Sequence, residues 1–530
     1  MGVLLPTVLF FLKRERSFLL RIALPCRRAY RVVSNEYEDV AMKKEVLLVQ
    51  RADDWAGIQD AVGNAVVQVF AQVSEFDWLE PYRTQEQHEN RGSGFLINED
   101  GYVITNAHVV HEAKRVWIHI PALGQQNVHA TIVGFCPERD IALLRIGKED
   151  LPQVRQQLGV IPAVTFGNSD LVRRTDPVLV LGYPLGQYRL KSTTGIVSGR
   201  ESGSGQAFIQ ITAPVNPGSS GGPLLNRDGQ VVGLTIAGFF EAQNVGYAIP
   251  VNELILILDD LYTQRLVRRP LLGARFVFAS DEKAQFLGNP QPSGLYISRV
   301  FFGSPLEKAG VLEGDMLYEF NGFPIDAYGD TVAPWGSDRT SFHDLIARVK
   351  VGETVHLVLY RAGKRKEITF SMAFMPLYPI RHLYPDYEDV EYETIGGLVV
   401  MELSDNHIPE LFDDAPELVK YQSTENKTEA VLVITHVLPG SLAHQVRTLA
   451  PGDTITEING KPVKTLDSFR RLVKKSSRNG FLTIKTARDI FAVFSLKRVV
   501  EDEVRLSADF LYPISPLVQQ LVKIMKKEEK

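Results

Sequence analysis

The sequence has few cysteines and lacks any long apolar run. Of its 530 residues only Cys26 and Cys136 are cysteines, and they lie in very different segments. This excludes a disulfide framework and a cysteine-ligated metal site. No apolar run reaches the roughly 20 residues that cross a bilayer. The 58 basic and 63 acidic side chains give a formal charge of −5, which argues against an electrostatic nucleic-acid binder.

Residues 1–51 have the composition of a targeting segment. Gly2–Leu12 is apolar, Lys13-Arg14-Glu15-Arg16 follows, and several arginines come soon after. This pattern fits a cleaved export signal, a short anchor that associates with a membrane, or an Arg-rich organellar presequence. A mis-set start codon or a plain disordered leader are the alternatives. We favour targeting, because within residues 2–31 basic residues far outnumber the single acidic residue, Glu15.

Short strands separated by turns are expected over residues 52–264, which is typical of an all-β sandwich or a pair of barrels. A helix is expected over Val251–Leu261, where Asn252 is positioned to cap it. The basic stretch Arg265–Arg269 then marks a boundary. The expected strands are Ala65–Val73, Gly94–Ile97, Tyr102–Ile104, Val116–Ile120, Ala130–Val133, Ile141–Ile146, Pro177–Leu181, Ala207–Ile211, Val231–Ile236 and Gly246–Ile249.

Beyond this boundary the chain repeats itself. Gly303–Gly322 returns as Gly440–Gly460, and both copies run from a short helix through Gly-Asp to a strand that ends at Asn-Gly. An amphipathic helix follows each copy, over Ser341–Val349 and Leu466–Lys475. This order resembles the circularly permuted PDZ domains of bacterial and organellar proteases. We name the two modules PDZ1 (265–377) and PDZ2 (378–500), and expect residues 501–530 to form a C-terminal tail.

A PDZ resemblance implies that each module holds a peptide's terminal carboxylate with the backbone amides of a Gly-containing loop. In PDZ1 the loop is expected at Leu272, Gly273 and Ala274. In PDZ2 the candidate is the segment from Gly396 to Val399, and packing against neighbours is there an equally good interpretation. The expected peptide partners are C-terminal segments of other proteins.

Three short segments of residues 52–264 together carry the residue types for amide hydrolysis. Thr105–Val110 contains His108, Arg139–Ile146 contains Asp140, and Asn216–Leu224 reads N-P-G-S-S-G-G-P-L. Histidine can take the proton of an attacking serine, while a carboxylate orients the imidazole. Ser220, directly before the two glycines, is the expected nucleophile. The glycines of this loop allow backbone amides to face the developing oxyanion.

Taken alone, each of these residues also has an ordinary structural interpretation that involves no catalysis. A serine among glycines is more often a turn residue, a lone histidine is usually a core residue, and Asp140 beside Arg139 fits an exposed ion pair. His111 is a competitor for the base, although it lies outside the Thr105–Val110 motif. The joint occurrence and order of the three segments favour catalysis.

With G-S-G-F at Gly92–Phe95, G-x-P-L-G at Gly182–Gly186 and T-G-I-V-S-G at Thr194–Gly199, these motifs resemble the HtrA/DegP family of serine endopeptidases. The resemblance implies a mainly β protein, with a chymotrypsin-like double β-barrel followed by two α+β PDZ domains. It also implies homotrimers or larger assemblies that need no cofactor, ATP or metal and cut unfolded proteins. Family members are mostly exported or organellar, and we expect the bacterial periplasm, with mitochondrion or chloroplast as alternatives.

Carried onto this chain, the resemblance implies a base, an orienting carboxylate, a nucleophile and an oxyanion hole made by two backbone amides. It further implies an apolar specificity pocket. These residues are His108, Asp140 and Ser220 for the triad, Gly218 and Ser220 for the oxyanion hole, and Ile236, Ala237 and Phe239 for the pocket.

Two positions depart from the family pattern. Ser219 stands where the family commonly has Asn, and Thr212 where it has Asp. Either change is expected to loosen the loop that carries the nucleophile. The alternative function is therefore a holdase chaperone or PDZ scaffold that keeps the fold and hydrolyses little. The segment Ser74–Arg91 is also shorter than the long loop that restrains some family members.

Overall fold

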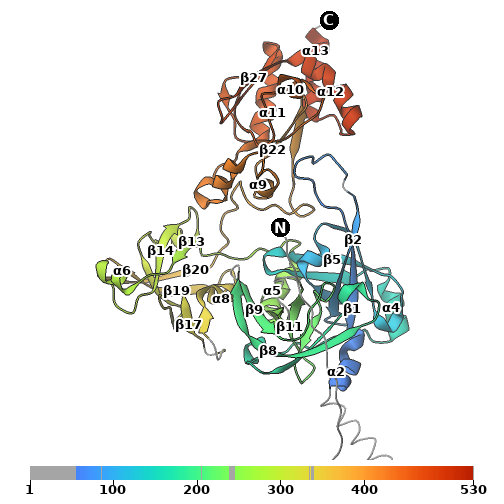
Figure 1. The fold of residues 1–530 in the computed structure, drawn as a ribbon, viewed down its shortest axis with the longest axis vertical. Helices are drawn as coiled ribbons and strands as arrows, with labels where there is room; N and C mark the ends of the chain where they lie inside the picture. The colour runs from blue at the N-terminus through green and yellow to red at the C-terminus, as the bar shows by residue number, and fades with distance from the viewer. Residues whose placement is uncertain are drawn as a thin grey trace, which may run out of the picture. The chain divides into compact units, whose positions relative to one another are not determined.

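The computed structural model describes residues 55–84, 86–203, 206–237, 245–333, 335 and 339–528 (Figure 1). The expected targeting segment, residues 1–51, lies outside the described residues. Within the described part of the chain, no helix has the length and apolar character that a membrane crossing requires.

The first six strands close into a barrel in the order β1-β2-β3-β6-β5-β4, with every neighbouring pair antiparallel. Side chains that face the interior, such as Phe95 and Ile104, are fully buried. Helix α2 (Trp55–Val62) precedes the barrel and α4 (Leu151–Leu158) follows it. The strands are β1 (Val66–Val73), β2 (His88–Leu96), β3 (Tyr102–Thr105), β4 (Ala113–His119), β5 (Val128–Cys136) and β6 (Ile141–Ile146).

The next six strands form a second closed barrel, in the order β10-β11-β12-β9-β8-β7. The two barrels confirm the expected chymotrypsin-like architecture. Strand β8 was not among the expected strands, because its polar and glycine residues give no apolar alternation. The strands are β7 (Pro177–Gly182), β8 (Lys191–Gly203), β9 (Gln206–Ile211), β10 (Pro223–Leu225), β11 (Val231–Ile236) and β12 (Gly246–Pro250).

Helix α5 (Val251–Thr263) follows the second barrel and packs against β5 of the first. Gly134 of β5 permits this approach, since a Cβ atom there would stand 2.2 Å from the carbonyl oxygen of Leu261. The expectation that Asn252 caps α5 was wrong. The N-cap is Pro250, and the Asn252 side chain instead accepts a hydrogen bond from the Ser169 amide at 3.3 Å.

PDZ1 contains a sheet in the order β13-β14-β15-β19-β20, so β13 lies at its edge. Its core includes Ile297 and Phe320 with Phe342 of α8. The short strands β17 (Asp330–Val332) and β18 (Arg339–Ser341) pair antiparallel outside this sheet. The other elements are β13 (Ala274–Val277), α6 (Asp281–Phe286), β14 (Leu295–Val300), α7 (Pro305–Lys308), β15 (Met316–Phe320), β16 (Phe323–Pro324), α8 (Phe342–Ala347), β19 (Thr354–Arg361) and β20 (Lys364–Ser371).

PDZ2 repeats this plan with an added strand and two added helices (Figure 1). Its sheet order is β21-β22-β23-β24-β26-β27. The expected boundary at residue 500 falls inside α12, and Leu506 and Leu521 are fully buried. The elements are β21 (Tyr392–Ile395), β22 (Leu398–Glu402), α9 (His407–Glu410), β23 (Leu432–Val437), α10 (Leu442–Val446), β24 (Thr454–Ile458), β25 (Lys461–Pro462), α11 (Leu466–Lys475), β26 (Phe481–Thr486), β27 (Phe491–Ser495), α12 (Leu496–Phe510) and α13 (Pro516–Glu528).

The segment between β1 and β2 contacts PDZ2 through aromatic rings, a hydrogen bond and the Glu80–His436 ion pair. The Trp78 ring meets the His407 ring edge-on at 5.1 Å, and the Thr435 hydroxyl donates to the Leu79 carbonyl oxygen at 2.9 Å. His407 is fully buried, and its Nδ1 accepts a hydrogen bond from the Ser404 amide at 3.0 Å. The segment that precedes β2 is therefore part of the packing of PDZ2.

The buried imidazole of His407 makes the stability of this region depend on pH. Burial lowers the pKa of His407 to about 3, whereas an unfolded histidine titrates at about 6.5. Because the unfolded chain binds the proton more tightly, the stabilisation is complete above about pH 6.5 and declines as pH falls toward 3. We expect the urea midpoint of the wild-type chain to fall between pH 7 and 4.

The matched control for this effect is His407→Asn, whose side-chain oxygen can still accept the Ser404 amide. Its urea midpoint, followed by tryptophan fluorescence, is expected to depend less on pH over the same range. Parallel pH profiles for the two chains would show that His407 is not the source.

Candidate functional site

His108 and Asp140 meet at the rim of the first barrel. His108 lies on the short helix α3 (Ala107–Val110), and its Nδ1 is 2.8 Å from Oδ2 and 3.0 Å from Oδ1 of Asp140. The His108 amide also donates to Asp140 Oδ1 at 2.9 Å. The Nδ1 contact leaves Nε2 of the ring as the atom that can exchange a proton with a substrate or nucleophile.

The backbone around Asp140 turns sharply to aim its carboxylate. Asp140 has φ 53° and ψ 44°, a left-handed conformation that is uncommon for a residue other than glycine. It directly follows the 3₁₀ turn Pro137–Arg139, and the Asn106 side chain donates to its carbonyl oxygen at 2.9 Å. This hydrogen bond ties the Asp140 turn to the residue that precedes α3.

Residues 216–222 carry Ser220 and are here named the serine loop. Their backbone adopts conformations that favour glycine. Gly218 and Gly221 have φ values of 95° and 86°, in the region that favours glycine. A Cβ atom at Gly221 would also lie 2.1 Å from the carbonyl oxygen of Ser93. Among the described residues, no acceptor is found for the amides of Gly218 and Ser220. These two amides are therefore available to an incoming oxygen atom.

The Ser220 hydroxyl is engaged by the end of β11. Its oxygen accepts a hydrogen bond from the Ala237 amide at 2.9 Å, and the side chain is largely buried. No hydrogen bond joins Ser220 to His108 among the described residues. Because the hydroxyl acts only as an acceptor toward Ala237, its own proton is still available for donation to a base.

Ser93 of β2 fastens the serine loop, a role that sequence reasoning missed although Gly92–Phe95 was noted as a motif. Its amide donates to the Ser220 carbonyl oxygen at 2.7 Å, and its hydroxyl donates to the Gly218 carbonyl oxygen at 2.7 Å. The same hydroxyl accepts from the Tyr183 amide at 2.9 Å. The Thr105 hydroxyl, near His108, donates to the Ser93 carbonyl oxygen at 2.7 Å. Ser93 thus links the two sequence segments that carry Ser220 and His108.

The expected specificity pocket is described in part. Ile236 ends β11 and is 5 % exposed. Ala237 follows it, and the Ala237 amide donates to the Ser220 hydroxyl oxygen. Phe239 lies outside the described residues. At the two positions that depart from the family pattern, the Thr212 hydroxyl accepts from the Ile196 amide at 2.9 Å, and the Ser219 backbone carbonyl, which any residue would supply, accepts from the Thr235 hydroxyl at 2.8 Å.

The described residues contain no group of three or more His, Cys, Asp or Glu side chains placed to hold a metal ion. Cys136, the one cysteine among them, is buried, and burial raises the pKa of its thiol to about 12. A thiol that stays protonated at neutral pH is a poor nucleophile and a poor metal ligand.

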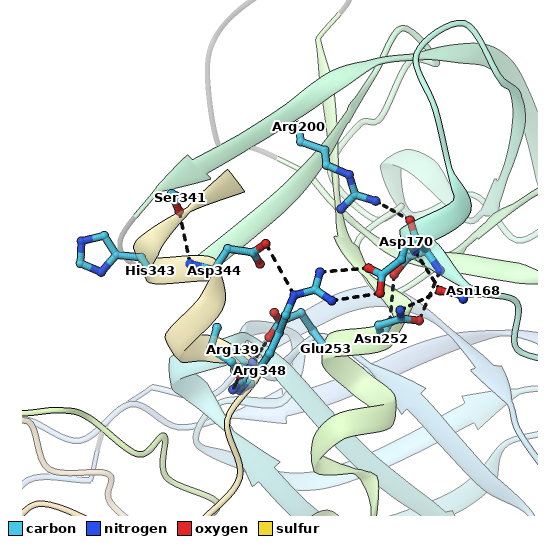
Figure 2. Close-up of polar contacts among 12 residues, drawn as sticks. Arg139, Asn168, Asp170, Arg200, Asn252, Glu253, Ser341, His343, Asp344 and Arg348 are labelled. Atoms are coloured by element: carbon cyan, nitrogen blue, oxygen red, sulfur yellow. Dashed lines mark hydrogen bonds and ion pairs between the residues drawn. The ribbon is translucent and has the colours of Figure 1, made fainter. Parts of the chain in front are cut away.

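Arg139, the residue before Asp140, forms a buried ion pair with Glu253 of α5 (Figure 2). The two side chains are 2 % and 4 % exposed. A second nitrogen of Arg139 donates to the carbonyl oxygen of Ala347, the last residue of α8 in PDZ1, at 2.7 Å. Burial lowers the pKa of Arg139 to about 10, so it remains charged at neutral pH. The turn that carries Asp140 is therefore tied to both α5 and PDZ1.

A second ion pair joins the protease domain to PDZ1. Arg348 directly follows α8, and its two terminal nitrogens donate to the carboxylate of Asp170 at 2.9 and 3.0 Å (Figure 2). Asp344 of α8 lies beside Arg348, and burial raises the pKa of the Asp344 carboxyl. Paired hydrogen bonds between a guanidinium and a carboxylate are geometrically specific, so this contact also fixes the direction of α8.

Comparison with known proteins assigns all three domains. Residues 92–234 match the model of a trypsin-like peptidase domain, and residues 270–372 and 384–511 match models of PDZ domains. A probable periplasmic serine endoprotease, DegP-like, of Marinomonas sp. is 32% identical over 419 residues, which are 77% of this chain and 79% of the relative. The chain belongs to the HtrA/DegP family of serine endoproteases. A DegP-like relative of Chlamydia pneumoniae is 29% identical over 78% of this chain and 77% of its own.

Solved structures of the family are also similar to this DegP-like chain. The HtrA-type protease AlgW with a decapeptide has a TM-score of 0.48 and 25% identity, over 61% of this chain and 99% of that one. The serine endoprotease from Yersinia pestis has a TM-score of 0.42 and 23% identity, over 60% of this chain and 97% of that one.

The Arg139–Glu253 pair of this HtrA-type protease gives a test by double-mutant cycle. Arg139→Met leaves the Glu253 carboxylate buried without its partner, and breaking a buried pair in this way costs about 3–5 kcal/mol of unfolding free energy. Arg139→Met with Glu253→Gln removes both charges, so we expect it to regain much of the loss. Urea denaturation of the single and double variants measures this.

Arg348→Met serves as the control, because Arg348 and Asp170 are 24% and 17% exposed and their pair should cost less to break. Additive losses for Arg139→Met and Glu253→Gln would contradict a coupled buried pair.

Proposed function

We propose that Ser220 is the nucleophile of this endopeptidase, His108 its general base and Asp140 the group that orients His108. The observation that carries this proposal is the contact of both Asp140 oxygens with His108 Nδ1, at 2.8 and 3.0 Å. Such a contact fixes the ring tautomer and stabilises the imidazolium that forms when the serine proton is taken. Ser93 supports the assignment by fastening the carbonyl groups on both sides of Ser219.

In the mechanism that follows, the Ser220 oxygen attacks the scissile carbonyl carbon while its proton passes to His108 Nε2. The amides of Gly218 and Ser220 donate to the resulting oxyanion, each contributing roughly 3 kcal/mol to the barrier reduction. His108 then returns the proton to the leaving amine, and water completes the cycle through the acyl-enzyme. Ile236, Ala237 and Phe239 would form the apolar wall that receives the substrate side chain.

A second candidate function is a proteolytically weak holdase or scaffold. Two observations favour it: the Ser220 oxygen is bonded to the Ala237 amide, and no hydrogen bond joins it to His108 among the described residues. Catalytic hydrogen bonds are often loose before substrate binds, which favours the protease over the holdase. The two candidates differ in whether Ser220 reacts with an electrophile.

We expect a fluorophosphonate probe to label the parent chain and to leave Ser220→Ala unlabelled, because only an activated hydroxyl attacks phosphorus. Ser219→Ala, the neighbouring serine, is the matched control and should keep its label. Casein cleavage should be lost with Ser220→Ala and should fall about 10⁴-fold in kcat with Asp140→Asn, which releases the imidazole tautomer. A parent chain that stays unlabelled yet suppresses aggregation would favour the holdase.

Family membership supports our proposals for the cellular role, the assembly and the location. We infer an ATP-independent quality-control protease that cuts unfolded or damaged proteins, works as a homotrimer or larger assembly and is regulated by its PDZ domains. The periplasmic location named for its relatives supports export to the bacterial envelope. Light scattering measures the assembly, and sequencing the mature N-terminus decides between a cleaved signal and an anchor at residues 1–51.

PDZ1 is the proposed receptor for peptide C-termini, through Leu272, Gly273 and Ala274. Gly273 has φ 81°, and Ala274 begins the edge strand β13, which can accept an extended peptide as an added strand. Among the described residues, no acceptor is found for the amides of Leu272 and Gly273. They are therefore available to a terminal carboxylate.

A further inference from the structure

The expected carboxylate-binding loops, at residues 272–274 of PDZ1 and 396–399 of PDZ2, make equivalent backbone contacts and can be compared atom by atom. We name them the carboxylate loops. In PDZ1 the Gly273 carbonyl oxygen accepts from the Phe301 amide at 2.9 Å, and in PDZ2 the Gly397 carbonyl oxygen accepts from the Leu438 amide at 2.7 Å. A Cβ atom at Gly273 would stand 2.2 Å from the Cβ of Ser304, and one at Gly397 would stand 2.0 Å from the Cβ of Ser441. Gly397 is thus the counterpart of Gly273.

The residue before each glycine is equivalent as well. The Leu272 carbonyl oxygen accepts from the Leu306 amide at 3.2 Å, and the Gly396 carbonyl oxygen accepts from the Ala443 amide at 3.1 Å. The donors lie at corresponding positions of α7 and α10. The Gly396 amide therefore occupies the place that the Leu272 amide has in PDZ1, where a peptide carboxylate is proposed to bind.

In PDZ2 the Gly396 amide already donates a hydrogen bond to a carboxylate of the same chain. The Gly396 amide donates to Oε1 of Glu503 at 2.6 Å, and the Tyr512 hydroxyl donates to Oε2 of the same side chain at 2.8 Å. Glu503 lies on α12 and is fully buried. It is 107 residues from Gly396 in sequence, so the contact is a tertiary one.

The edge beside this loop is also covered. Strand β21 pairs antiparallel with β22, from Tyr392 opposite Met401 to Ile395 opposite Leu398. The counterpart of β22 in PDZ1 is β13, which is the edge strand of its sheet. An extended peptide adds to a PDZ domain along this strand, and β21 uses the backbone groups that the peptide would need.

We propose that PDZ2 is a self-liganded domain, in which Glu503 fills the carboxylate loop and β21 fills the strand position of a peptide ligand. PDZ1 is then the domain of this chain that receives peptide C-termini. α12 is the internal partner of PDZ2 and not a solvent-exposed tail. The assignment concerns binding alone and does not depend on the proposed catalytic roles.

The energetics of the contact agree with a built ligand site. Burial raises the pKa of Glu503, whereas the Tyr512 hydroxyl and the amides of Gly396 and Gly397 act in the opposite direction by stabilising the charged form. A buried carboxylate is tolerated when hydrogen-bond donors replace its water shell. Val499, one helical turn before Glu503, lies against Gly396, where a Cβ atom would stand 3.3 Å from its Cγ2.

The first experiment counts peptide sites on the full chain carrying Ser220→Ala, which prevents cleavage. The probe is a fluorescein-labelled hexapeptide with an apolar C-terminal residue, and the same peptide with a C-terminal amide is the control for dependence on the carboxylate. We expect at most one carboxylate-dependent site per chain, and at least tenfold weaker binding with Gly273→Ala. Binding that survives Gly273→Ala and is lost with Gly397→Ala would overturn the proposal.

If the Ser220→Ala chain with both loops intact has no carboxylate-dependent peptide site, the proposed peptide site in PDZ1 is contradicted, while the closed state proposed for PDZ2 still agrees with the result. The two proposals therefore fail separately.

The second experiment replaces the internal ligand with a small one. Glu503→Ala leaves the loop amides and the Tyr512 hydroxyl facing a cavity, so we expect a lowered Tm that sodium acetate raises more than sodium chloride does at equal concentration. Acetate should have no such differential effect on the parent chain or on Glu503→Gln, in which a neutral side chain fills the space. If Glu503→Ala fails to fold, acetate in the growth or refolding medium should restore soluble protein.

Tyr512→Phe removes a single donor and is expected to lower Tm by less than Glu503→Ala. A Glu503→Ala chain as stable as the parent, or one that acetate stabilises no more than chloride does, would show that Glu503 is not a ligand of the loop.

Discussion

The hydrogen bond from the Ser93 amide to the Ser220 carbonyl oxygen is the contact on which the site depends. The proposed base and its carboxylate come from the first barrel and the proposed nucleophile comes from the second, so these residues can form a site only where the barrels meet. Ser93 belongs to the first barrel and bonds to Gly218, Ser220 and Tyr183 of the second. A Cβ atom at Gly92 would stand 3.2 Å from the Ser220 carbonyl oxygen, so this glycine permits the close approach of the serine loop. A Cβ atom at Gly94 would instead stand 2.9 Å from the Ile104 carbonyl oxygen within the first barrel.

One PDZ plan serves two purposes in this chain. In PDZ1 no acceptor for the loop amides is found among the described residues, and the helix that follows strands β17 and β18 is anchored to the protease domain through Ala347 and Arg348. In PDZ2 the same loop binds the Glu503 side chain of α12. The difference between the two domains is the presence of β21 and α12 around a conserved plan, so the added elements decide which domain is open.

Prediction from sequence succeeded where a segment carries its own signal. Ile141–Ile146 and Val231–Ile236 are rich in apolar residues and were predicted with the bounds that the structure has. Strand β8 was missed because serine, threonine and glycine in it give no apolar period, and barrel closure supplies its pairing. The His108–Asp140 contact was predictable from motif and order. Glu503 was not, because a charged residue in an amphipathic helix is normally exposed, and only the tertiary fold brings it to Gly396.

The contact of Thr435 with Leu79 has a consequence for synthesis of the chain. These residues are 356 positions apart. A ribosome adds roughly 5–20 residues per second, so the first barrel can form on the order of half a minute before its partner has emerged. During that interval the rings of Trp78 and Tyr82 lack the contacts with His407 and Tyr512. Translation of the C-terminal third of the chain must therefore be finished before this segment between β1 and β2 is fully packed.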